Sequence, residues 1–194
     1  MREGPFLRGV KVVLRPVEEG DYALIHRWMN HPEVWHYMDY ERPVSLADVA
    51  DDVEQSRAEG QPFTIVVDGR PIGRIGLNRF RPRDRICGFY LYIGEPAFWG
   101  KGFAQDAVMT LLGFAFDRWD LFQVELWTLG DNDRALGTYE RCGFVEEGRL
   151  RDRSWKDGRW VDHVMMSVNR EEFERARGGR LGLPEGADDP RPTP

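Results

Sequence analysis

Residues 99–104, Trp-Gly-Lys-Gly-Phe-Ala, decide the fold of this chain. Before them, residues 88–93 read Gly-Phe-Tyr-Leu-Tyr-Ile, an apolar and aromatic run that is typical of a buried strand. After them, apolar side chains recur at helical spacing from about Gly102 to Asp117, which predicts a helix with one buried face. We therefore expect a strand that runs through a glycine turn into the N-terminus of a helix.

A turn of this kind can hold an anion. The first backbone N–H groups of a helix have no intrahelical partner, and the helix dipole adds partial positive charge there. Gly100 and Gly102 leave no side chain between the backbone and a phosphate. The turn therefore predicts a phosphate or pyrophosphate cradle, although two glycines alone also fit an ordinary strand-to-helix turn. It matches neither the P-loop pattern nor the three-glycine dinucleotide fingerprint.

A second block, residues 132–144, reads Asn-Asp-Arg-Ala-Leu-Gly-Thr-Tyr-Glu-Arg-Cys-Gly-Phe. We predict a short helix from Asn132 to Arg141, closed by Gly143. Tyr139 lies two helical turns after Asn132, so both side chains can project from the same side of this helix.

Together the two blocks resemble motifs A and B of the GNAT acyl-CoA N-acyltransferases, in their RimJ/RimL-like branch. Motif A reads [Gln/Arg]-x-x-Gly-x-[Gly/Ala]; Gly102 and Ala104 fill its last two positions, and Trp99 stands where Gln or Arg is usual. Motif B reads Asn-x-x-[Ala/Ser]-x-x-x-Tyr-Glu-[Lys/Arg]-x-Gly-Phe, which residues 132–144 match. The ending, residues 157–166, is also similar to that of this branch, so the resemblance extends over roughly residues 8–168.

The resemblance implies acetyl-CoA as co-substrate, bound in a gap where the fourth and fifth strands of the sheet splay apart. It places the pantetheine arm along the backbone of Leu91, Tyr92 and Ile93, with Asn132 as a hydrogen-bond partner. Tyr139 would approach the thioester sulfur and act as the acid. The pyrophosphate would contact the turn itself, which implies six binding residues: Trp99, Gly100, Lys101, Gly102, Phe103 and Ala104.

We expect direct attack of an amine on the thioester, because no cysteine, serine or lysine has a convincing base beside it. Deprotonation would then need a carboxylate or ordered water. Glu125 is either this base or an ion-paired framework residue. Asp162 either contacts a cationic acceptor or is a hydrogen-bonded structural aspartate.

Aromatic side chains near residues 35–40 could line the acceptor site, since the first helices cover that site in the resembling enzymes. The candidates are Trp35, Tyr37 and Tyr40, although core packing explains such residues equally well. Two acceptor classes are open: a protein N-terminus, or a small cationic amine such as a polyamine, an amino sugar or an aminoglycoside. The alternative from another class is a catalytically silent acyl-CoA-binding sensor or structural module.

Composition predicts one domain over residues 1–177 and a disordered tail over residues 178–194, which are rich in glycine, proline and charge. The net charge of −6 argues against nucleic-acid and anionic-membrane partners. Cys87 and Cys142 lie far apart, without histidines at ligand spacing, which predicts a reduced protein without a metal. No apolar leader or span is evident, so we expect the cytoplasm; a homodimer is left open.

The fold class that these patterns and the resemblance predict is α/β. We expect a mixed, mostly antiparallel sheet of about seven strands, with helices on both faces and a splayed strand pair. The expected strands are 10–16, 62–67, 71–77, 86–93, 121–129, 145–149 and 160–168, and the expected helices are 18–30, 45–59, 102–117, 132–141 and 169–177.

Overall fold

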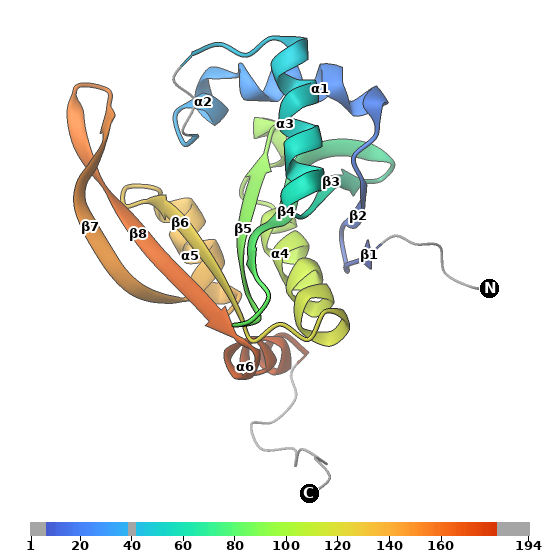
Figure 1. Ribbon diagram of the computed structural model, residues 1–194, viewed down its shortest axis with the longest axis vertical. Coiled ribbons are helices and arrows are strands. Elements are labelled where there is room, and N and C mark those ends of the chain that lie inside the picture. The colour runs from blue at the N-terminus through green and yellow to red at the C-terminus, as the bar shows by residue number, and fades with distance from the viewer. Residues whose placement is uncertain (1–6, 39–41, 182–194) are drawn as a thin grey trace, which may run out of the picture.

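An eight-stranded sheet forms the centre of the computed structural model, which describes residues 7–38 and 42–181 (Figure 1). The strand order is β1-β2-β3-β4-β5-β6-β8-β7, and only the β5–β6 pair is parallel. The mostly antiparallel α/β fold is thus confirmed, with one strand more than expected because β1 is too short to show alternation. The strands are β1 Leu7–Arg8, β2 Val13–Pro16, β3 Gln61–Val67, β4 Arg70–Arg81, β5 Ile86–Ile93, β6 Gln123–Leu129, β7 Val145–Lys156 and β8 Arg159–Asn169.

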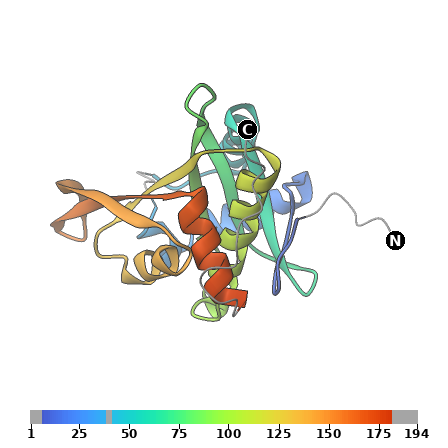
Figure 2. The ribbon, with the colours of Figure 1, turned by 90° about the horizontal axis from the view of Figure 1, so that it is seen from below.

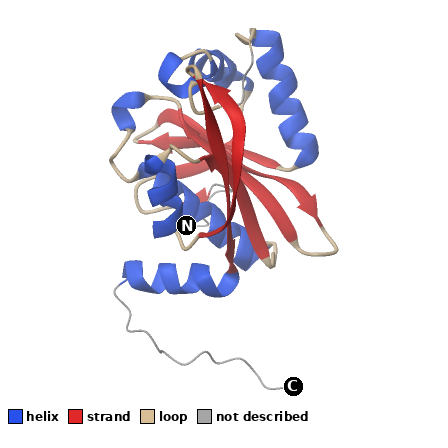
Figure 3. Ribbon diagram, turned by 90° about the vertical axis from the view of Figure 1, so that its left-hand side faces the viewer, coloured by secondary structure: helices blue, strands red, loops and turns tan. Residues whose placement is uncertain are grey.

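Helices cover both faces of the sheet (Figure 3). One face carries α4 Phe103–Gly113, which continues into the π-helical turn η3 Phe114–Arg118, together with α5 Asp133–Arg141 and α6 Arg170–Leu181. Figure 2 shows α6 beside α4, where the rings of Phe116 and Phe173 lie 5.3 Å apart. The other face carries the 3-10 turn η1 Glu19–Asp21, α1 Tyr22–Met29, α2 Pro32–Trp35 and α3 Leu46–Glu59.

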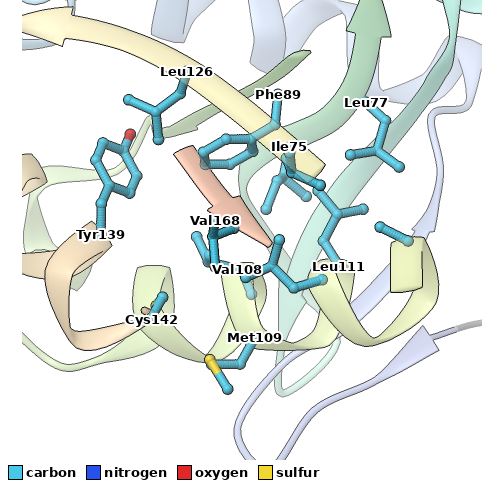
Figure 4. Packing of buried hydrophobic residues seen from close by; sticks show 14 of the residues in the cluster. Ile75, Leu77, Phe89, Val108, Met109, Leu111, Leu126, Tyr139, Cys142 and Val168 are labelled. Atoms are coloured by element: carbon cyan, nitrogen blue, oxygen red, sulfur yellow. The ribbon is translucent and has the colours of Figure 1, made fainter. Parts of the chain in front are cut away.

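The hydrophobic core is divided by the sheet into two clusters, and β5 contributes to both. Its Phe89 packs in the larger cluster with Val108 and Leu111 of α4 (Figure 4). Its Tyr92 points to the opposite face and packs with Trp28 of α1. Because alternate side chains of a strand point to opposite faces, β5 is anchored on both sides, which holds rigid the strand that leads into the glycine turn.

The predicted first strand, residues 10–16, is wrong in its first half. Residues 10–12 form a corner between β1 and β2, and their three backbone N–H groups donate to the carboxylate of Asp106 on α4 at 3.2, 2.7 and 3.0 Å. Asp106 is only 1% exposed. A buried carboxylate that accepts several charge-assisted hydrogen bonds replaces the strand ladder here.

The last two strands are longer than the predicted ranges 145–149 and 160–168. They form a hairpin that projects from the body of the molecule (Figures 1 and 2), closed by a two-residue turn at Asp157-Gly158, both with positive φ. Most side chains of β7 are exposed. The strand therefore lacks the alternation of apolar and polar residues that predicts a strand from sequence. The Asp-Gly pair, which is typical of a hairpin turn, was the one local pattern that indicated the hairpin.

The C-terminal helix also exceeds its predicted end. α6 continues to Leu181, so the expected domain boundary at residue 177 falls inside a helix. The rest of the predicted disordered tail, residues 182–194, lies outside the described residues. Within residues 7–38 and 42–181, no helix combines the length and apolar character that a membrane crossing requires.

Candidate active site

The parallel strands β5 and β6 stay paired over only three residues each. The register runs from Ile86↔Gln123 to Gly88↔Glu125, and beyond it the strands separate (Figure 1). Residues 89–93 of β5 keep β4 as partner on one side, while their other edge faces the gap. An exposed strand edge can pair with an extended ligand backbone. The splayed pair that the family resemblance implied is therefore present.

A cavity of about 550 Å³ occupies this gap. Its lining comes from six elements that are far apart in the sequence. The lining residues are Phe89–Ile93 of β5; Phe98–Gly100 and Gly102–Gln105 of the turn and α4; Leu126–Leu129 of β6; Asn132, Arg134, Ala135, Thr138, Tyr139 and Arg141 of and before α5; Glu33, Val34, Tyr37 and Met38 in and after α2; and His163 of β8.

The glycine turn at residues 100–102 opens on this cavity. Gly100 and Gly102 have φ of +72° and +80°, a region that favours glycine. Gly102 is the N-cap of α4 and offers no capping side chain, so the amides of residues 103–105 precede the first intrahelical bond, from Asp106 N to Gly102 O. Lys11 adds a cation: its Nζ donates to Lys101 O at 3.1 Å. The turn thus has the geometry and the charge that a phosphate requires.

Neighbouring side chains hold the turn in place. Trp99 Nε1 donates to Ile93 O at 2.8 Å, which joins the turn to the end of β5. The rings of Phe98 and Phe103 lie 5.7 Å apart across it. Lys101, predicted to bind the cofactor, is exposed and does not line the cavity; its ammonium lies 5.7 Å from the Phe98 ring centroid.

Tyr139 projects from α5 into the gap. It is 7% exposed, and its ring packs edge-on against Phe89 at 5.6 Å, on the side where Figure 4 also places Leu126. Burial raises the pKa of Tyr139 well above its usual value, and the Cys142 thiol raises it further. Among the described residues its hydroxyl has no hydrogen-bond partner. The side chain is therefore a neutral phenol with a proton available for a ligand.

Asn132 lines the same cavity, as the spacing to Tyr139 predicted. It is the N-cap of α5, and its Oδ1 accepts from Ala135 N at 3.2 Å. That bond fixes the side chain and leaves the Nδ2 donors for another partner. The structure thus brings Asn132 and Tyr139 to one cavity with Leu91, Tyr92 and Ile93.

The two candidate carboxylates lie outside the cavity lining. Glu125 pairs with Arg81, with Nη2 and Oε2 2.8 Å apart, so the structure favours the ion-paired alternative over a base. Asp162 accepts from Asp152 N at 3.1 Å, where the β7–β8 register is irregular. Its Oδ2 also lies 3.9 Å from Arg149 Nη1, and these contacts favour the structural alternative.

Of the three aromatic side chains predicted at the acceptor site, one lines the cavity. Tyr37 lines the cavity, Trp35 does not, and Tyr40 lies outside the described residues. Two ties join the segment after α2 to the turn of the β7–β8 hairpin: Lys156 Nζ donates to Met38 O at 2.7 Å, and His36 Nδ1 lies 2.9 Å from Asp157 Oδ2. The segment after α2, which contributes Tyr37 and Met38 to the cavity lining, is therefore joined to the hairpin.

Sequence reasoning missed four lining residues that carry charge or a proton-accepting group: Glu33, Arg134, Arg141 and His163. His163 pairs in register with Leu129 and lies 2.7 Å, through Nε2, from Ser154 Oγ. No pattern in the sequence distinguishes these residues, because each reaches the cavity only when its element packs beside β5 or β6.

Three features of this structure fit coenzyme A: the open edge of β5, the glycine cradle, and the phenol between them. Within the described residues, no group of three or more His, Cys, Asp or Glu side chains could hold a metal ion. When bound, acetyl-CoA would supply the activated acetyl group; Leu91, Tyr92, Ile93, the turn and Asn132 would hold it.

Comparison with known proteins agrees with this site. The acetyltransferase (GNAT) domain family matches residues 11–145. Spermidine N(1)-acetyltransferase of Vibrio cholerae is 28% identical over 167 residues, which cover 84% of this chain and 95% of that protein. Aminoglycoside N(6')-acetyltransferase type 1 of Klebsiella pneumoniae is 25% identical over 181 residues, covering 86% and 87%. The crystal structure of the Vibrio cholerae spermidine N-acetyltransferase with CoA and spermine superposes with a TM-score of 0.77, at 26% identity, over 84% of this chain and 98% of that chain.

Proposed function

Because this chain belongs to the GNAT acetyltransferase family and is an acetyl-CoA-dependent N-acetyltransferase, we propose that its acceptor is a small cationic amine of the polyamine type. The predicted family, co-substrate and acetylation of an amine are confirmed, and the alternative of a silent acyl-CoA sensor is set aside. What the proposal adds is the class of acceptor. Relatives named for spermidine and for aminoglycosides support a small amine over a protein N-terminus.

The observation that carries the proposal is Glu33. It is the one carboxylate among the cavity-lining residues that the structure describes, and the same lining contains the aromatic side chains of Tyr37 and Trp127. A carboxylate beside aromatic faces suits an alkylammonium, through charge and through cation–π attraction. The contacts that join the segment after α2 to the hairpin restrict this side of the cavity, which favours a slender amine over the terminus of a folded protein.

The chemistry that we propose is direct transfer. The neutral amine attacks the thioester carbonyl carbon, a C–N bond forms and the C–S bond breaks, and the Tyr139 hydroxyl gives its proton to the departing sulfur. The nitrogen then loses one proton to become the amide, and that proton, carried by water, restores the Tyr139 phenol. An acyl-cysteine route has little support, because Cys87 and Cys142 are both fully buried. Burial also raises the pKa of Cys87 to about 12, which keeps it a thiol.

The ammonium of the acceptor must lose a proton before attack. Two lining side chains can accept it, the Glu33 carboxylate and the His163 imidazole, and ordered water is the third route. Replacing each in turn, Glu33→Gln and His163→Asn, and measuring kcat against pH distinguishes them. The true proton acceptor is the residue whose loss abolishes the acidic limb of the profile.

The acceptor is tested by thiol release from acetyl-CoA with spermidine, spermine, an aminoglycoside and peptides with free N-termini. We expect the highest kcat/KM for a polyamine. Glu33→Gln should raise the polyamine KM by about two- to fivefold, the range for an exposed ion pair. Glu171→Gln, a neutralised glutamate in the first turn of α6, is the matched control. A peptide acceptor with the highest kcat/KM would refute the proposal.

Compartment and assembly remain predictions. We propose the cytoplasm, because both cysteines are free and buried, which suits a reducing environment. A homodimer is still to be tested by light scattering of the purified protein.

A further inference from the structure

Trp99 is the first residue of the glycine turn and lines the cavity. In the structure the indole N–H is already used, because it donates to Ile93 O. The face of the indole, however, is covered by a cation from another segment. The guanidinium carbon of Arg134 lies 3.8 Å from the Trp99 ring centroid.

Arg134 is the second residue of α5 and reaches across the gap to the glycine turn. Its guanidinium also lies 5.6 Å from the Tyr37 ring, and it lines the cavity together with Gly100 and Gly102. Stacking holds the plane of a guanidinium but leaves its five N–H donors, which lie in that plane, available for other partners.

These donors have no acceptor within residues 7–38 and 42–181: the Arg134 guanidinium forms neither an ion pair nor a hydrogen bond there, and only the backbone carbonyl of Arg134 is used, by Thr138 Oγ1. Arg141, two helical turns further along α5, differs: its Nη2 donates to Thr138 Oγ1 at 3.3 Å. The chain has more carboxylates, 33, than lysines and arginines, 27, so free acceptors are not scarce. A stacked, unpaired cation that faces a cavity is suited to an anionic ligand.

We propose that Arg134 binds a phosphate of coenzyme A, with the indole face of Trp99 as its platform. The neighbouring groups are consistent with an anion at this place. The N-terminus of α4 points to it, and Lys11 Nζ would lie 3.2 Å from a Cβ at Gly102. The pyrophosphate and the 3′-phosphate of coenzyme A share this chemistry, and the test separates them.

The experiment measures dissociation constants by calorimetry for coenzyme A, dephospho-CoA, 4′-phosphopantetheine and pantetheine. Arg134→Ala should weaken coenzyme A binding by roughly tenfold or more, as for a lost charge-assisted hydrogen bond, and leave pantetheine binding unchanged. Arg134→Lys keeps the charge but not the planar stack, so its dissociation constant for coenzyme A should lie between those of the unmodified protein and of Arg134→Ala. A loss that persists with dephospho-CoA assigns the pyrophosphate, and a loss confined to coenzyme A assigns the 3′-phosphate.

Arg177→Ala is the matched control, since Arg177 also stacks on an aromatic ring, that of Phe173 at 5.0 Å, but on α6 and outside the cavity lining. It should change none of the four constants. Two results overturn the proposal: Arg134→Ala binds coenzyme A as tightly as the unmodified protein, or it loses the same factor for pantetheine as for coenzyme A. The second result would mean that Arg134 only shapes the cavity.

Discussion

Replacing Tyr139 by phenylalanine should slow acetyl transfer without weakening the fold. The hydroxyl makes no hydrogen bond with the described part of the chain, so its removal breaks none. The ring contacts with Phe89 and Phe144, at 5.6 and 5.7 Å, are kept by the new side chain. We therefore expect the free energy of unfolding to change by less than about 1 kcal/mol.

The expected loss of rate follows from the role of the hydroxyl. General acid catalysis contributes typically 10²- to 10⁴-fold, and a thiolate is a fairly good leaving group, so we expect the lower end, about 100-fold in kcat. That factor corresponds to about 2.7 kcal/mol in the activation free energy. Because burial raises the pKa of Tyr139, the phenol stays protonated in ordinary buffers, and its ionisation should not limit kcat on the alkaline side.

The assay is thiol release at saturating amine, with the acetyl-CoA dissociation constant measured in parallel. Tyr92→Phe is the comparison, because Tyr92 is also buried, also lines the cavity and also has a hydroxyl without a hydrogen-bond partner. The loss in kcat for Tyr139→Phe should exceed that for Tyr92→Phe at least tenfold. Equal losses, or a loss that matches a weaker dissociation constant, would refute the acid role.

Three further predictions concern stability. Asp106→Ala leaves three backbone N–H groups without their acceptor and should lower the free energy of unfolding by about 3 kcal/mol in urea titrations; an unchanged midpoint would contradict this. Burial alone would raise the pKa of Asp21, but hydrogen bonds, that of Arg15 foremost, hold it below 3.8. The ionised Asp21 side chain therefore stabilises the fold fully above about pH 4, and this contribution is lost as the pH falls through the lowered pKa. Asp21→Asn should make the free energy of unfolding depend less steeply on pH in the acidic range. An unchanged pH dependence would exclude this role of Asp21. Arg74 is only 2% exposed, and its Nη1 lies 2.5 Å from Asp52 Oδ2. Asp52→Asn removes the charge of this partner and should lower the free energy of unfolding, measured by thermal unfolding, by about 2 kcal/mol. A change near zero would show that the ion pair is dispensable.

Local patterns were sufficient wherever one segment decides its own conformation. The glycine turn at residues 99–104 joins a strand to a helix as predicted, because glycine conformation and helical periodicity are both local properties. Ser45 caps α3 and Asn132 caps α5, as their side chains indicate. The placement of Asn132 and Tyr139 on one side of α5 could also be predicted, because helical spacing alone puts residues seven apart on the same side.

Segments without an apolar stripe were harder to predict. β7 has few buried side chains, so its length depends on the ladder with β8 and on the turn at Asp157-Gly158 rather than on alternation. The corner at residues 10–12 resembles a strand in sequence, yet Asp106, more than 90 residues away, takes its N–H groups.

The sequence by itself determined the family, the co-substrate and the conformation of the turn and of α5, because those features are carried by short contiguous motifs. The tertiary structure alone decided how the cavity is closed and charged. It places Glu33, Arg134 and His163 on one lining, and it assigns Glu125 to an ion pair with Arg81 instead. The physical reason is that side chains from helices and strands on both sides of a splayed strand pair line the cavity. These residues are far apart in the sequence, so no local pattern predicts that they lie close together.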